Sequence, residues 1–138
     1  SYSLIWGDKG LSSDKNYVWY EFCNVYVHKS ENFDWMVGHK YEYSEAIQHT
    51  INELLKKGSV EDLKNMFVLN LSDRNITDVS PLAGLTNLGW LYLHQNRISD
   101  ISSLAGLTNL EILYLSQNQI SDYSLLKNLE INGCKITK

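Results

Sequence analysis

The 138-residue sequence predicts an α/β fold: a short right-handed solenoid, with a parallel β-sheet on its concave face, follows a small α+β cap. Three observations predict this fold. A 22-residue pattern is repeated between residues 69 and 126, aliphatic residues alternate with polar or aromatic residues inside it, and the residues before it are rich in Tyr and Trp. We therefore expect a capping segment over residues 1–66 and about three to four coils over residues 67–138, the last of them short.

The repeat is read from matched stretches of sequence. Leu91-Tyr92-Leu93 recurs 22 residues later as Leu113-Tyr114-Leu115, and the spacing Leu-x-x-Leu-x-Leu-x-x-Asn-x-Ile starts at Leu88 and again at Leu110. Many positions agree at once, which is the mark of a repeat architecture. Each repeat is therefore expected to form one structural unit of the same kind.

Alternation within the repeat predicts which side chains are buried. Successive side chains of a strand point to opposite faces, so Leu91 and Leu93 share one face, and Trp90, Tyr92 and His94 share the other. One coil cannot cover its own leucines, but stacked coils bury them in a column and pair their strands in parallel. The leucine face is therefore the core, and the opposite face is open.

Two asparagines follow the predicted strands at the same position of the repeat. Asn96 and Asn118 stand where the chain leaves the strand, and a buried side-chain amide there can bond turn backbone groups that have no ladder partner. We assign them a structural role. Arg74 occupies the same position in the first repeat, and such irregularity is common in a terminal repeat.

The open face of the sheet supplies the candidate binding residues. Trp and Tyr are the residue types that dominate interface energetics, so a bound protein partner would explain large rings on a solvated sheet. The alternative is that these rings only cover one another as cross-strand neighbours. The predicted partner-binding side chains are Val68, Asn70, Trp90, Tyr92, His94, Ile112, Tyr114, Ser116 and Glu130.

Glu130 enters this set through the alignment of the last coil. Placing Leu129 and Ile131 under Leu113 and Leu115 predicts a strand there, an abbreviated return segment, and Cys134 in the asparagine position as a structural thiol. The other cysteine, Cys23, lies in the distant N-terminal part, so we expect no disulfide. Because no polar cap follows the last coil, we expect either that the native protein continues with more repeats or that two copies pair through the C-terminal edge; this homodimer is an alternative to partner binding.

The N-terminal segment contains three candidate strands. They are rich in aromatic and β-branched residues and are separated by polar turns, which predicts a small antiparallel sheet. The candidates are Tyr2–Trp6, Tyr17–Val27 and Asp34–Tyr43. This sheet is a second place where two copies of the chain could pair.

Helix signals follow the candidate strands. Ser44 can cap an amphipathic helix that stops at Gly58, and Ser59, with Asp62 three residues later, resembles a second capping signal. A solenoid exposes the core edge of its first coil unless something covers it. We therefore expect these helices and the sheet to cap the stack.

Composition and motifs exclude several functions. The net charge of −4 and the absence of a basic patch argue against nucleic-acid binding. The sequence contains no run of about 18 apolar residues, so we expect no membrane insertion. The four histidines are scattered, and no metal-binding, phosphate-binding or nucleophile motif is present. We expect no catalytic residues, no metal, no cofactor and no enzymatic activity.

The stretches Asn75–Leu88 and Gln95–Ile101 resemble the 22-residue leucine-rich repeats of the bacterial internalin family, and the resemblance covers about residues 67–137. It implies a solenoid behind a small N-terminal cap, and a protein partner bound by the concave sheet. It also implies display at the cell surface or secretion, with the cytoplasm as the alternative. The predicted function is a non-catalytic protein–protein interaction module; the alternative is a structural or self-assembling domain.

Overall fold

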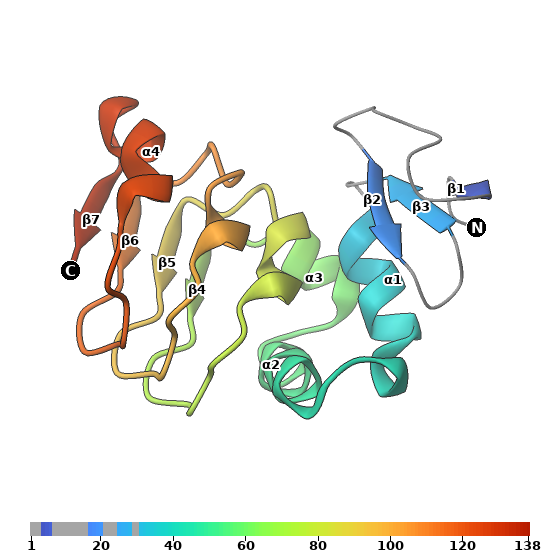
Figure 1. The fold of residues 1–138 in the computed structure, drawn as a ribbon. Helices are drawn as coiled ribbons and strands as arrows, with labels where there is room; N and C mark the ends of the chain where they lie inside the picture. The colour runs from blue at the N-terminus through green and yellow to red at the C-terminus, as the bar shows by residue number, and fades with distance from the viewer. Residues whose placement is uncertain (1–3, 7–16, 21–24, 29–30) are drawn as a thin grey trace.

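A computed structural model describes residues 4–6, 17–20, 25–28 and 31–138 of the chain. Its C-terminal half is a stack of coils, each contributing one short strand to a parallel sheet whose order follows the chain (Figure 1). The strands are β4 (Val68–Asn70), β5 (Trp90–Tyr92), β6 (Ile112–Tyr114) and β7 (Lys135–Thr137). The predicted short solenoid with a parallel sheet is confirmed.

The register of the sheet follows the 22-residue period. Leu69 pairs with Leu91, and Leu91 pairs with Leu113, so that the leucines form one buried column. Apolar residues every three positions predict a tight return instead of a long helix, and each return segment contains one short 3-10 turn. These turns are η4 (Ser80–Gly84), η5 (Ser102–Leu104) and η6 (Ser124–Leu126).

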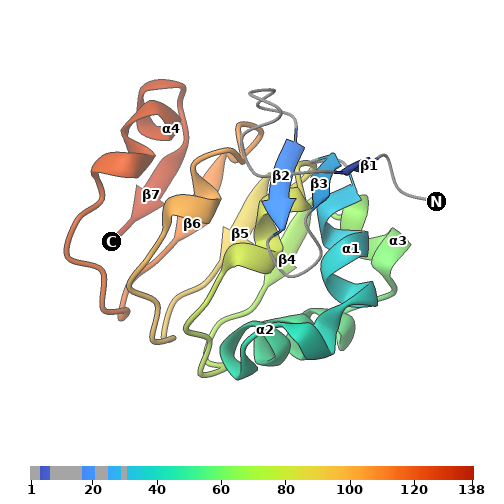
Figure 2. The same cartoon turned by 45° about the vertical axis from the view of Figure 1, so that its right-hand side comes forward.

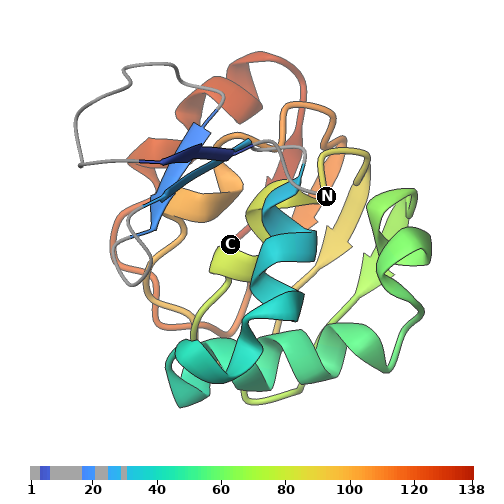
Figure 3. The same ribbon diagram turned by 90° about the vertical axis from the view of Figure 1, so that its right-hand side faces the viewer.

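Three helices cover the first coil at the β4 end of the sheet (Figures 2 and 3). Phe33, Leu54 and Leu63, one from each helix, belong to the same buried cluster as the leucines of the coils. The helices are α1 (Asn32–Gly38), α2 (Glu45–Leu55) and α3 (Val60–Lys64). The predicted cap is therefore helical where it meets the coils, and the division of the chain at residue 67 stays a prediction because one core continues across it.

Both predicted helix caps are present. Ser44 Oγ accepts a hydrogen bond of 3.3 Å from the backbone N–H of Ile47 at the start of α2. At the start of α3, Ser59 Oγ accepts from Asp62 N–H (3.1 Å), and Asp62 Oδ2 accepts from Ser59 N–H (3.0 Å). This reciprocal pair is a capping box, which the sequence spacing predicts.

An antiparallel sheet precedes the helices, as predicted, but its three strands, in the order β1-β3-β2, are not the three that the sequence suggested. The single strand expected over Tyr17–Val27 is two paired strands, and residues 21–24 between them lie outside the described residues, as does Cys23. The strands are β1 (Leu4–Trp6), β2 (Tyr17–Tyr20) and β3 (Val25–His28).

The strand predicted over Asp34–Tyr43 is wrong. The segment forms α1 and, after it, the 3-10 turn η3 (Lys40–Glu42). Its aromatic content suggested a strand, but the apolar residues Phe33, Met36 and Val37 recur at helical spacing and face the core. Periodicity, and not β propensity, decided this element.

The alignment of the last coil is also wrong. Residues 127–131 form helix α4 (Lys127–Ile131), and Ile136, 23 residues after Leu113, occupies the position expected for Leu129. The return segment is therefore longer, not shorter. Leu126 and Leu129 are buried at helical spacing, whereas Ile131 is 70% exposed, which is why the alternation of residues 129 and 131 was misleading.

Two residues change role because of this shift. Glu130 lies on α4 and not on the open face of the sheet, where Lys135 and Thr137 stand beside Ile112 and Tyr114 instead. Cys134 is a free, buried thiol directly before β7, so it does not occupy the asparagine position, which follows a strand. Burial raises the pKa of this thiol, and Glu130 adds to the effect.

Candidate functional site

The candidate site is the face of the sheet opposite the leucines, which we call the concave surface. The leucines of β4, β5 and β6 are buried, while the side chains between them are partly or largely exposed, as the alternation predicts. We restrict the name to the side chains on and next to the strands β4, β5 and β6: Phe67, Val68, Asn70, Trp90, Tyr92, His94, Ile112, Tyr114 and Ser116.

The apolar part of the concave surface runs across the first position of each strand. Trp90 of β5 is in register with Val68 of β4 on one side and with Ile112 of β6 on the other. The Trp90 side chain is 38% exposed and Val68 is 48% exposed, so the neighbours cover one another only in part. Phe67 extends this row, with its ring centroid 6.2 Å from that of Trp90.

The aromatic part occupies the third position of each strand. The rings of Tyr92 and Tyr114 are stacked, with centroids 5.3 Å apart and 23° between their planes. The His94 ring meets both of them edge-on, at 6.3 Å from Tyr92 and 5.8 Å from Tyr114. His94 Nδ1 is buried and has no hydrogen-bond partner within the part of the chain that the structure describes. Packed rings of this kind have few rotamers to lose on binding.

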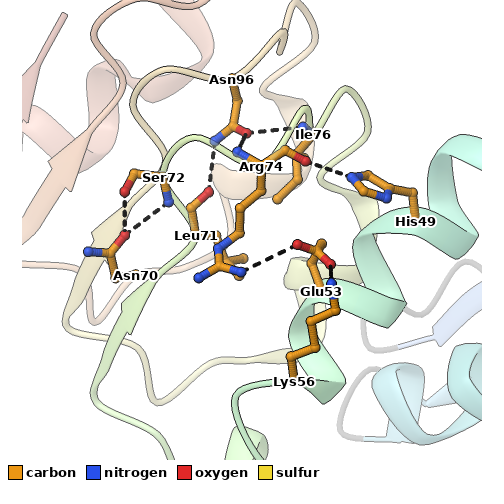
Figure 4. A network of polar contacts seen from close by, with 9 residues as sticks. All are labelled: His49, Glu53, Lys56, Asn70, Leu71, Ser72, Arg74, Ile76 and Asn96. Carbon is orange, nitrogen blue, oxygen red and sulfur yellow. Dashed lines mark hydrogen bonds and ion pairs between the residues drawn. The ribbon is translucent and has the colours of Figure 1, made fainter.

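The first coil contributes a polar corner to the concave surface. Asn70 Oδ1 accepts hydrogen bonds from the backbone N–H of Ser72 (2.9 Å) and from its hydroxyl (2.7 Å), as Figure 4 shows. Both residues are at least partly open to solvent. This corner is therefore held in place by its own hydrogen bonds.

The asparagine position fixes the turns that follow the strands. Asn96 Oδ1 accepts from the backbone N–H groups of Arg74 (2.9 Å) and Ile76 (3.0 Å) in the preceding coil, and its Nδ2 donates to the carbonyl of Leu71 (2.9 Å) (Figure 4). The same Nδ2 donates to the carbonyl of Leu93 (3.0 Å). The side chain is only 7% exposed. The predicted structural role of this position is confirmed.

Ionic contacts join the cap to the first coil. The buried carboxylate of Glu53 on α2 forms ion pairs with Lys56 and with Arg74, whose Nη1 lies 3.3 Å from Glu53 Oε1 (Figure 4). The hydrogen bond from Lys56 lowers the pKa of Glu53; burial opposes this, and the bond from Arg74 adds to it. His49 Nε2 lies 2.6 Å from the Arg74 carbonyl. Arg74, which stands where the later coils have an asparagine, therefore connects the first coil to the cap.

The structure brings together eight of the nine predicted side chains and excludes Glu130. It adds Phe67, which the alternation rule assigns to the leucine face because it stands next to Val68. The feature of the sequence that could have indicated this position is Gly89, whose missing side chain leaves room for the Phe67 ring.

Among the described residues, no cluster of three His, Cys, Asp or Glu side chains could hold a metal ion. No helix in the described part is long and apolar enough to cross a membrane.

Comparison with known proteins defines the class of the repeats. Residues 90–128 match the family model described as Leucine Rich repeats (2 copies), so the leucine-rich repeats predicted from the sequence are confirmed there. The chain is similar to an internalin C2 from Listeria monocytogenes strain 4b F2365, at 40% identity over 62% of this chain and 33% of that chain, with a TM-score of 0.48. It is similar as well to the internalin inlF of that strain, at 51% identity over 51% of this chain and 21% of that chain, with a TM-score of 0.48.

Both similar structures are internalins, the type of protein whose repeats the sequence resembles. The chain spans about a third of the length of the first and about a fifth of the second. No curated protein matches the chain.

Proposed function

We propose that this chain is a non-catalytic module that binds a protein partner through the concave surface. The observation that supports the proposal most strongly is the set of exposed large apolar side chains on a sheet whose own core lies on the other face. Phe67, Val68, Trp90 and Tyr114 are 48%, 48%, 38% and 37% exposed. Val68, Trp90 and Tyr114 lie on the adjacent strands β4, β5 and β6, and Phe67 directly precedes β4.

The two faces of the sheet have separate roles. The leucines stabilise the coils, so the outward side chains are not needed to build the core. A contiguous apolar patch of this kind marks an interaction site more often than a random surface does, and Trp and Tyr are enriched among interface hot spots. The rings also lie on short, hydrogen-bonded strands, so a partner would meet a surface with little conformational freedom to lose.

Affinity capture with the whole chain tests the proposal. We expect Trp90→Ala and Tyr114→Ala each to reduce the binding free energy for the captured partner by about 2 kcal/mol or more, which lowers the affinity roughly 30-fold. Tyr41→Ala is the matched control, because Tyr41 is 83% exposed but lies on the cap, away from the sheet. Equal capture by all three variants, with unchanged melting temperatures, would contradict partner binding by this surface.

Self-association is the second candidate function. Leu125 and Ile131 are 56% and 70% exposed on the turn η6 and the helix α4 that precede β7. Exposed large apolar side chains of this kind are a candidate contact for a second copy of the chain. Sedimentation equilibrium tests this candidate: a dimer that Ile131→Glu dissociates supports it, and a monomer at all concentrations opposes it. Pairing through the N-terminal sheet stays a prediction.

A further inference from the structure

Helix α4 carries two opposite charges, one helical turn apart, on its exposed side. Leu129 is buried with the leucines of the coils, whereas Ile131 is largely exposed. Lys127 and Glu130 are exposed as well. Residues three and four positions apart are neighbours on the surface of a helix, so Lys127, Glu130 and Ile131 form one face. We call it the α4 face; it combines a cation, an anion and a large apolar group.

A cleft of about 500 Å³ adjoins the α4 face, and all three of its residues line the cleft. Lys138 lines it too, with Nζ 3.5 Å from Glu130 Oε1 and 5.2 Å from the centroid of the Tyr123 ring. Lys127, in contrast, has no ion-pair partner in the part of the chain that the structure describes. The α4 face therefore offers an unpaired ammonium group beside a carboxylate, which can accept more than one donor.

A second copy of the chain fits this arrangement of charges. A two-fold interface brings the same surface of both copies together, so that surface must be complementary to itself. A face with charges of one sign would repel its copy. On the α4 face the order of Lys127 and Glu130 along the helix is reversed in an antiparallel copy, which places unlike charges opposite each other.

We propose that two copies of the chain pair through the α4 face, with their α4 helices antiparallel about a two-fold axis. Lys127 of each copy meets Glu130 of the other, so the same contact of opposite charges occurs twice. Ile131 of each copy packs on the aliphatic stem of Lys127 of the other copy, whose ammonium group stays in water. The inference rests on self-association, the second candidate function, and names the residues that carry it.

Charge reversal tests the pairing by sedimentation equilibrium of the full chain. Lys127→Glu and Glu130→Lys each turn two attractive contacts of the dimer into repulsive ones, so each should weaken the dimer about tenfold or more. The double variant restores unlike charges across the interface, and so does an equimolar mixture of the two single variants. Both should dimerise again, which chains that had merely unfolded would not do.

Lys57→Glu and Glu42→Lys are the matched controls, because they make the same changes of net charge at exposed positions of the cap. They should dimerise like the wild type. A wild type that is monomeric at all concentrations overturns both this pairing and self-association, and leaves partner binding by the concave surface standing. A dimer that neither Lys127→Glu nor Glu130→Lys weakens overturns this pairing alone, since the copies then meet elsewhere. Failure of both the double variant and the mixture to dimerise also overturns it.

Discussion

The Oδ1 atom of Asn96 accepts a hydrogen bond of 3.0 Å from the backbone N–H of Ile76, which belongs to the preceding coil. The same amide bonds backbone groups on both sides of the boundary between the two coils, so it couples the coils directly. Asn118 repeats the arrangement one coil later, with Oδ1 3.0 Å from the N–H of Ile98 and Nδ2 2.9 Å from the carbonyl of Leu93. Stacked leucines supply most of the burial, but these amides fix how the coils face one another.

Asn96→Ala should therefore destabilise the fold. The substitution leaves buried backbone donors and acceptors without a partner, which costs about 2–4 kcal/mol for several such groups. Urea unfolding measures the change as a lower midpoint at an unchanged slope. Asn109→Ala is the control, because Asn109 is exposed and makes a single bond of 2.8 Å to the Thr86 carbonyl. A loss no larger than that of the control would refute the coupling role.

Gln95→Gly should stabilise the fold. Gln95 has a φ of 57°, in the left-handed region, as do Asp73 and Gln117 at the equivalent positions of the other coils. In this region the steric strain of a residue with a Cβ costs about 1 kcal/mol or more in the folded state. This cost exceeds the loss of stability that glycine causes by raising the conformational entropy of the unfolded chain. We expect a net gain of about 0.5 kcal/mol in thermal or urea unfolding. Gln119→Gly, at an exposed residue outside the left-handed region, should instead lose stability.

The sequence predicted those parts of the fold in which one periodic pattern is repeated. The 22-residue period placed β4, β5 and β6, their buried leucines and the asparagine position, because each coil must match its neighbour to be buried. Helix starts at Ser44 and Ser59 were predictable because capping is a local hydrogen-bond pattern. Eight concave residues followed from alternation alone.

The failures lie where two local patterns compete and packing against the coils decides between them. The segment after Glu31 has aromatic residues typical of strands, yet it forms α1 because its apolar residues pack against the first coil. Residues 127–131 have the alternation of a strand, but they form α4 and shift the last strand to 135–137. Phe67 could not be placed by alternation, since its position depends on the absence of a side chain at Gly89.

Thr50→Val should weaken the contact between the cap and the first coil. Thr50 is fully buried, and its hydroxyl lies 2.6 Å from the Asp78 carbonyl of the first coil and 3.2 Å from the Ala46 carbonyl. Valine has a similar shape but removes the donor, so a loss of about 1–2 kcal/mol is expected. Thermal unfolding would measure it. The exposed Thr77 provides the control, and a Thr77→Val variant as unstable as Thr50→Val would argue against the contact.

Glu53 should make the stability of the cap depend on pH. Its pKa in the folded chain is lowered, first by the hydrogen bond from Lys56 and further by Arg74, although burial opposes the shift. A carboxyl group with a lowered folded pKa contributes stability that is present above its unfolded pKa of about 4.3 and is lost as the pH falls through the folded pKa. Acidification from pH 6 to pH 3 should therefore destabilise the wild type more than Glu53→Gln, which has no such charge to lose.

The measurement is the free energy of unfolding of both chains at steps of pH across that window. The two curves should differ most near pH 6 and approach each other as the pH falls, because protonation of Glu53 removes the ion pairs to Lys56 and Arg74 that the glutamine already lacks. Glu42→Gln changes an exposed carboxylate outside the contacts of Figure 4 and should follow the wild type. Parallel curves for wild type and Glu53→Gln would show that the junction between the cap and the first coil is held by packing and neutral hydrogen bonds alone.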